Sequence, residues 1–65
     1  MNISISHIQM LSKAFALFNN GEYSSSKKIL EKILHTQHKN LDALLLLGVI
    51  FAIEKNFSIA IDYFS

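Results

Sequence analysis

Residues 44–64, LLLLGVIFAIEKNFSIAIDYF, decide the fold that we predict for this chain. Two apolar segments flank a short polar turn at Lys55 and Asn56. Each segment places a small residue among large ones, Gly48 in the first and Ala60 in the second. Small residues let two helices approach closely, and large side chains fill the space around the contact. The stretch therefore predicts two helices that pack together as an antiparallel hairpin.

The same arrangement occurs earlier in the chain at a constant distance. Ala14 is the earlier counterpart of Gly48. We call the interval of 34 residues from position 14 to position 48 the repeat offset. The repeat offset also relates Leu17 to Phe51, Tyr23 to Phe57, Ser24 to Ser58, Ser26 to Ala60, and Leu30 to Phe64. A period of this length is typical of helical repeat proteins. The chain is therefore predicted to be all-α, with two hairpins in register.

Capping signals predict where the helices of the first hairpin begin. Ser6 precedes Gln9 by three residues, which is the spacing of a capping box, so the first helix is expected over about residues 7–19. The Asn-Asn-Gly sequence that follows favours a helix end. Ser24 is the predicted N-cap of a second helix over about residues 25–36.

The second hairpin is predicted in the same way, with Asn40 capping a helix that ends near Glu54 and Ser58 capping the last helix. The helix after Asn40 is apolar on every side, which is typical of a buried helix. We expect Leu46, Ile50 and Ile53 to point away from their own hairpin. Two hairpins then leave them uncovered, to be buried by a further repeat, a second copy of the chain or a partner.

The pattern resembles the tetratricopeptide-repeat (TPR) family, whose repeat has about 34 residues and so equals the repeat offset of this chain. The second unit carries the family motif at Leu44, Leu47, Gly48, Phe51, Phe57, Ala60 and Phe64. The resemblance implies antiparallel helix-turn-helix hairpins stacked as the start of an α-solenoid. Residues 1–65 then form one domain, with a first repeat at about 7–40 and a second, truncated repeat at about 41–65.

The first unit is looser than the second, and Lys13 stands where the family has leucine. A terminal repeat needs a polar outer face, so Lys13 fits a first, capping unit. Stable arrays of this kind normally hold at least three repeats. We therefore expect the chain to be the N-terminal segment of a longer solenoid, or to associate with itself.

In the TPR family, the first helix of each unit lines a concave groove. The positions that match this groove, and that we predict to contact a partner, are Ile8, Leu11, Phe15, Phe18, Asp42, Leu45, Leu46, Val49 and Ile53. They are almost all apolar and include no lysine, which argues against clamping of a peptide carboxylate. The expected partner is a protein or peptide, such as an amphipathic helix. The alternative is that these apolar stripes are simply core.

Composition argues against most other classes of function. The chain has no cysteine, only three histidines and a net charge of +1, so we predict no metal, cofactor, nucleic acid or membrane partner. Its five acidic residues are scattered, and no nucleophile or phosphate-binding motif occurs, so no catalytic residue is predicted and the chain is not expected to be an enzyme. A cytoplasmic location is the default for a chain without cysteine or a targeting signal.

A rival hypothesis concerns the second unit, residues 35–64, which looks similar to repeats that precede bacterial glycosyltransferase domains. The chain would then be the N-terminal repeat segment of a larger enzyme, with catalysis outside it. The native sequence that follows Ser65 distinguishes this hypothesis from a plain interaction module.

Overall fold

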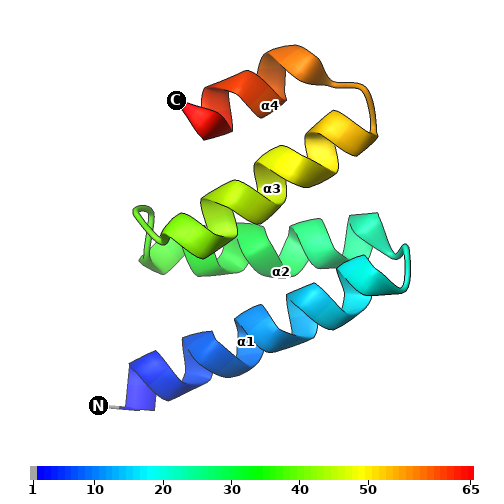
Figure 1. Cartoon of the computed structure of the whole chain (residues 1–65). Coiled ribbons are helices and arrows are strands. Elements are labelled where there is room, and N and C mark those ends of the chain that lie inside the picture. The colour runs from blue at the N-terminus through cyan, green and yellow to red at the C-terminus, as the bar shows by residue number, and fades with distance from the viewer. Residues whose placement is uncertain (1) are drawn as a thin grey trace.

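Four helices joined by short turns form the chain in the computed structural model, which describes the backbone of residues 2–65 and the side chains of residues 8–65. In order they are α1 (Asn2–Asn19), α2 (Tyr23–Thr36), α3 (Leu41–Ile53) and α4 (Phe57–Phe64). Successive helices run antiparallel and stack in chain order, with α1 and α4 outermost (Figure 1). No strand occurs among residues 2–65. The predicted all-α fold of two stacked antiparallel hairpins is confirmed.

Both hairpins turn through the same pattern of backbone hydrogen bonds. The N–H of Glu22 donates to the carbonyl oxygen of Leu17 at 2.9 Å, and the N–H of Asn56 donates to that of Phe51 at 2.8 Å. Each bond spans five residues, and a shorter bond lies inside it, which is the Schellman arrangement that ends many helices. The two turns are therefore separated by the repeat offset seen in the sequence.

The residue inside each turn takes a left-handed backbone conformation. It is Gly21 in the first hairpin, with φ of 80°, and Lys55 in the second, with φ of 65°. Glycine adopts this conformation at no steric cost, whereas a side chain makes it unfavourable. The second turn is therefore built on a strained residue where the first uses glycine.

The predicted N-caps of α2 and α4 are wrong by two residues. The N-cap positions are Glu22 and Asn56 instead of Ser24 and Ser58, and neither makes a side-chain capping hydrogen bond. The reason is that the Schellman turn ends directly on these two residues. The next helix therefore begins at once, and both serines lie inside its first turn.

The predicted start of the first helix is also wrong. α1 already includes Asn2, so Ser6 lies within the helix and does not cap it. The first six residues hold no proline or glycine, and nothing in them stops the helix from extending toward the N-terminus. The side chain of Ser6 lies outside those that the structure describes.

The predicted cap of the third helix is confirmed. The Asn40 side-chain oxygen accepts a hydrogen bond from the N–H of Ala43 at 3.0 Å. Its side-chain nitrogen donates to the Gln37 side-chain oxygen at 2.9 Å. Asn40 therefore fixes both the start of α3 and the end of the turn that joins the hairpins.

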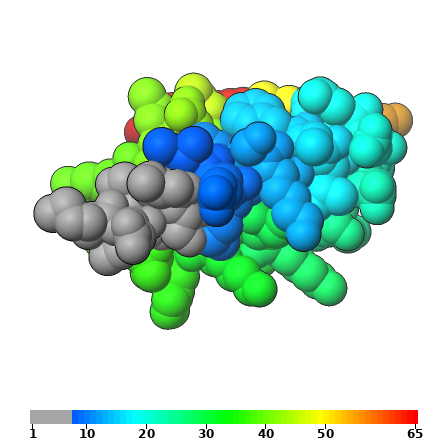
Figure 2. All heavy atoms as spheres, turned by 90° about the horizontal axis from the view of Figure 1, so that it is seen from below, coloured from blue at the N-terminus to red at the C-terminus, as the bar shows by residue number. Residues whose placement is uncertain are grey.

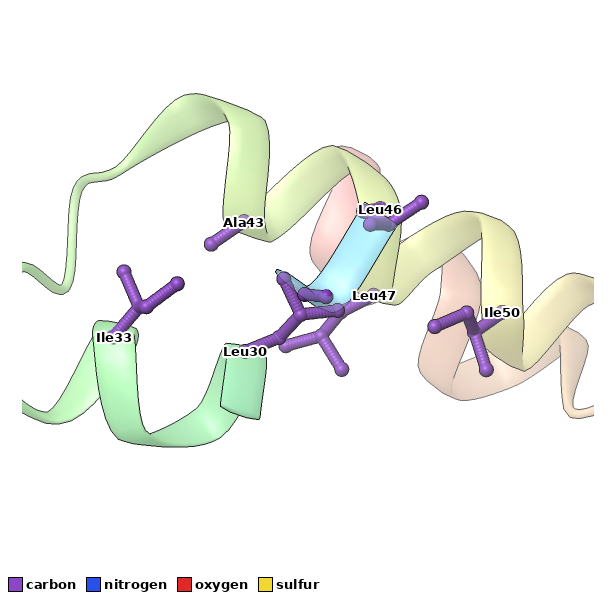
Figure 3. Packing of buried hydrophobic residues seen from close by; sticks show 7 residues of the cluster. Leu30, Ile33, Ala43, Leu46, Leu47 and Ile50 are labelled. Atoms are coloured by element: carbon purple, nitrogen blue, oxygen red, sulfur yellow. The ribbon is translucent and has the colours of Figure 1, made fainter. Parts of the chain in front are cut away.

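The core lies between the hairpins, where α2 faces α3. Its buried members are Ala14, Leu30, Ile33, Ala43, Leu46, Leu47 and Ile50. Figure 3 shows Leu30 and Ile33 of α2 pointing toward the side chains of α3. The expectation that two hairpins leave Leu46 and Ile50 uncovered is therefore wrong, since Leu46 is only 6% exposed and Ile50 is fully buried by the first hairpin. Ile53 does remain exposed.

A second link between the hairpins is polar. Lys27 of α2 donates to a carboxylate oxygen of Glu54, just after α3, at 2.8 Å. The same ammonium group lies 4.8 Å from the ring centroid of Phe51, within the range of a cation–π interaction. Lys27 therefore holds the end of α3 against α2, beyond the edge of the apolar core.

Candidate protein-binding face

One stripe of exposed apolar side chains runs along α3. Leu45, Val49 and Ile53 follow one another at intervals of four residues, so they lie on one side of the helix. All three are exposed, although α3 is otherwise the most deeply buried helix of the part that the structure describes. The stripe lies on the side of α3 that neither α2 nor α4 covers.

A second stripe lies on α1. Ile8 and Phe15 are exposed, whereas Leu11 and Phe18 are half-buried and pack against the core between the hairpins. Phe18 also packs against Tyr23 of α2, with their ring centroids 5.5 Å apart. Leu11 and Phe18 therefore already contribute to folding, and Ile8 and Phe15 carry the free surface of this stripe.

The two stripes are neighbours. Leu11 and Phe15 of α1 precede Leu45 and Val49 of α3 by the repeat offset, and α1 touches α3. Both stripes are exposed on helices that lie against each other. We name the resulting surface the α1–α3 face and define it as Ile8, Phe15, Leu45, Val49 and Ile53, which are between 39% and 65% exposed.

The remaining predicted contact residues behave differently. Leu46 belongs to the core and has almost no surface to offer a partner. Asp42 is exposed in the first turn of α3, where its charge suits the positive end of the helix dipole. Asp42 is therefore the one charged residue among the predicted contact positions.

The sequence reasoning missed a second exposed apolar surface, on α4. Ile61 and Phe64 are 60% and 51% exposed, and we name them the α4 end face. Their equivalents, one repeat offset earlier, are Lys27 and Leu30, which lie against α3. The repeat offset could have revealed this surface, because two positions that α3 covers in the first hairpin are more than half exposed in the second.

The structure offers little that suggests chemistry. Among residues 8–65, no three His, Asp or Glu side chains come close enough together to hold a metal ion. A shallow hollow is lined by Lys28, Glu31, Lys32 and His35, all of which belong to α2 alone. Side chains of one helix surface make a solvated face and not an enclosed site.

No helix among the described residues combines the length and apolar character needed to cross a membrane. No family model, curated protein or solved structure matches this chain. Its function is therefore inferred from the chemistry and geometry of its own residues.

Proposed function

We propose that this chain is a protein-interaction module of the TPR type that binds a protein or peptide partner on the α1–α3 face. The carrying observation is that five large apolar side chains lie exposed on two neighbouring helices, α1 and α3. Exposed apolar side chains that gather on neighbouring helices are unfavourable in water and often mark an interaction site. An amphipathic helix is the partner that such a face fits best.

Three features support the TPR assignment. The motif positions recur at the repeat offset, and so do the two Schellman turns. In the first hairpin, Ser26 and Ala14 meet at the close approach, where the Ser26 hydroxyl donates to the Ala14 carbonyl oxygen at 2.8 Å. In the second hairpin, Gly48 has the ring of Phe64 packed directly over its Cα. Small residues thus stand where the helices of each hairpin come closest.

The test uses a displayed library of amphipathic helical peptides, selected on the wild-type chain. Selected peptides are titrated against Val49→Lys, which places a charge on the α1–α3 face, and against Ile61→Asp, which places one on the α4 end face. We expect Val49→Lys to weaken binding by about tenfold or more, equivalent to about 1.4 kcal/mol, and Ile61→Asp to leave it unchanged. Circular dichroism checks that both variants remain folded.

Two outcomes would contradict the proposal. In the first, the library yields no specific binder. In the second, the selected peptides bind Val49→Lys as tightly as the wild type.

A further inference from the structure

The α4 end face, Ile61 and Phe64, lies at the opposite end of the stack from α1 (Figure 1). No residue among 8–65 covers its outer side, and both side chains are more than half exposed. Large apolar residues at this exposure are unusual on a helix that ends a stack, because a terminal helix normally carries a polar outer face. The molecule itself shows what such a face receives.

The first hairpin provides the template. At the positions equivalent to Ile61 and Phe64 it has Lys27 and Leu30, and α3 covers both. Leu30 is fully buried in the core between the hairpins, and Lys27 binds Glu54 and lies over the ring of Phe51. The occupant of this type of face is therefore a single helix that crosses it as α3 crosses α2.

The surface of α3 that makes this contact has a defined pattern. Ala43, Leu46, Leu47 and Ile50 belong to the core shared with the first hairpin, which places one small and three large aliphatic residues at i, i+3, i+4 and i+7. A helix with this pattern matches the apolar character of the α4 end face.

A second copy of the chain cannot supply such a helix by stacking end to end. Its α3 is already used, and the matching positions of α1 are Gln9, Ser12, Lys13 and Ala16, all exposed and mostly polar. α1 forms the opposite end of the molecule, which is the surface turned to the viewer in Figure 2. Residues 2–65 all lie in the four helices and their short turns, so none of these segments is left to cover α4.

We propose that the α4 end face binds one helix of a partner protein, and that this helix carries a small residue followed by large aliphatic residues three, four and seven positions later. This docking surface is separate from the α1–α3 face. It therefore goes beyond the proposed function and stands or falls on its own measurements.

The experiment uses a fluorescently labelled peptide of residues 40–54, NLDALLLLGVIFAIE. Leu45→Lys, Val49→Glu and Ile53→Lys make the peptide soluble, and these positions are exposed in α3, so its inner pattern is intact. Fluorescence anisotropy should show saturable binding to the whole chain. Binding should weaken at least tenfold for the chain variant Ile61→Asp, and likewise for a control peptide that carries Leu47→Asp.

Matched variants locate the site. The chain variant Val49→Lys should bind this peptide like the wild type, because Val49 lies on the other face. A peptide that instead displaces the native α3 would bind without regard to residue 61. Equal binding to Ile61→Asp and wild type therefore overturns the proposal, as does the absence of binding.

A charge test adds an independent readout. Ile61→Lys reproduces the residue found at Lys27, and the peptide ends at the glutamate that Lys27 contacts. The Ile61→Lys chain should therefore bind the peptide about two- to fivefold more tightly than it binds a peptide with Glu54→Lys, which is the range of an exposed ion pair. Equal affinity for the two peptides contradicts the α3-like geometry.

Light scattering of the chain alone, over a range of concentrations, tests whether a second copy of the chain covers the α4 end face. A monomer at every concentration agrees with a partner helix. A dimer that Ile61→Asp dissociates would show that two copies pair through their α4 end faces, and the proposal of a partner helix would then be wrong.

Discussion

Single residues set the closeness of the helices within each hairpin, and the two hairpins do so with different chemistry. In the first, Ser26 is buried and its hydroxyl donates to the carbonyl oxygen of Ala14. In the second, Ala60 stands in place of Ser26 and Gly48 in place of Ala14, and no equivalent hydroxyl exists. A Cβ at Gly48 would lie 2.8 Å from Cζ of Phe64, closer than carbon atoms pack. A side chain at position 48 would therefore have to displace the Phe64 ring.

Single substitutions in the two hairpin turns should have opposite effects on the free energy of unfolding. Lys55→Gly should raise the free energy of unfolding by about 0.5–1 kcal/mol, because relief of left-handed strain exceeds the extra chain entropy of glycine. Gly21→Ala should lower it by about 1 kcal/mol, since it places a Cβ at the same conformation. Urea denaturation measures both changes.

The control for this pair is Lys28→Gly, at a position within α2, which should lose about 1 kcal/mol through helix propensity alone. Loss of stability in Lys55→Gly, like that of the control, would show that the second turn carries no strain that glycine relieves.

At the level of the helices, the sequence locates every element but misplaces three of the four starts. Asn40 is identified correctly because its turn holds no competing signal, and its side chain caps α3. Ser24 and Ser58 mislead because a Schellman turn places the next helix directly after its last residue. That geometry depends on the left-handed residue, and a lysine at position 55 gives no sequence sign of it.

The caps predict a contrast between two asparagines. Asn40→Ala should destabilise the protein by about 1 kcal/mol, because it removes the hydrogen bond to the N–H of Ala43 and leaves that group without its cap. Asn56→Ala is the matched control, since Asn56 also occupies an N-cap position but makes no side-chain capping bond. It should change stability by only a few tenths of a kcal/mol. Equal losses in the two variants, measured by urea denaturation, would contradict these different roles.

The burial of α3 could not be predicted from its sequence. The sequence of a helix that is apolar on all sides does not indicate which side faces the core. For this reason, the sequence could not show that Leu46 and Ile50 are buried. α2 is amphipathic, and the apolar residues on its one face are all buried or packed against the core, namely Ile29, Leu30, Ile33 and Leu34. The candidate binding residues of α3 are therefore predictable only in part, and burial separates Leu45 from Leu46.

For the molecule as a whole, the two ends of the stack differ. The outer side of α1 carries Lys13 where the equivalent position of α3 has Leu47, which is fully buried. The outer side of α4 carries Ile61 where α2 has Lys27. The outer side of the stack is therefore more polar at α1 than at α4. Packing of a further helix on the stack is favoured at α4 and disfavoured at α1.

The last prediction concerns the ion pair that joins the two hairpins. Lys27 and Glu54 join them through a bond of 2.8 Å between side chains that are only 22% and 29% exposed. A double-mutant cycle with Lys27→Met and Glu54→Gln should give a coupling of about 0.5–1 kcal/mol, the upper part of the range for ion pairs at a surface.

Salt and single-variant effects separate the ion pair from the packing around it. Raising the salt concentration to about 1 M, where the Debye length is about 3 Å, should reduce the coupling.

Lys27→Met should lower the free energy of unfolding more than Glu54→Gln does. The ammonium group of Lys27 also lies over the Phe51 ring, and that contact survives loss of the carboxylate. Both variants should unfold in one transition, since the core between the hairpins is shared and neither hairpin keeps a core alone. A coupling of zero would show that α2 and α3 are held together by apolar packing alone. Separate unfolding of the two hairpins would show that each hairpin keeps a core of its own.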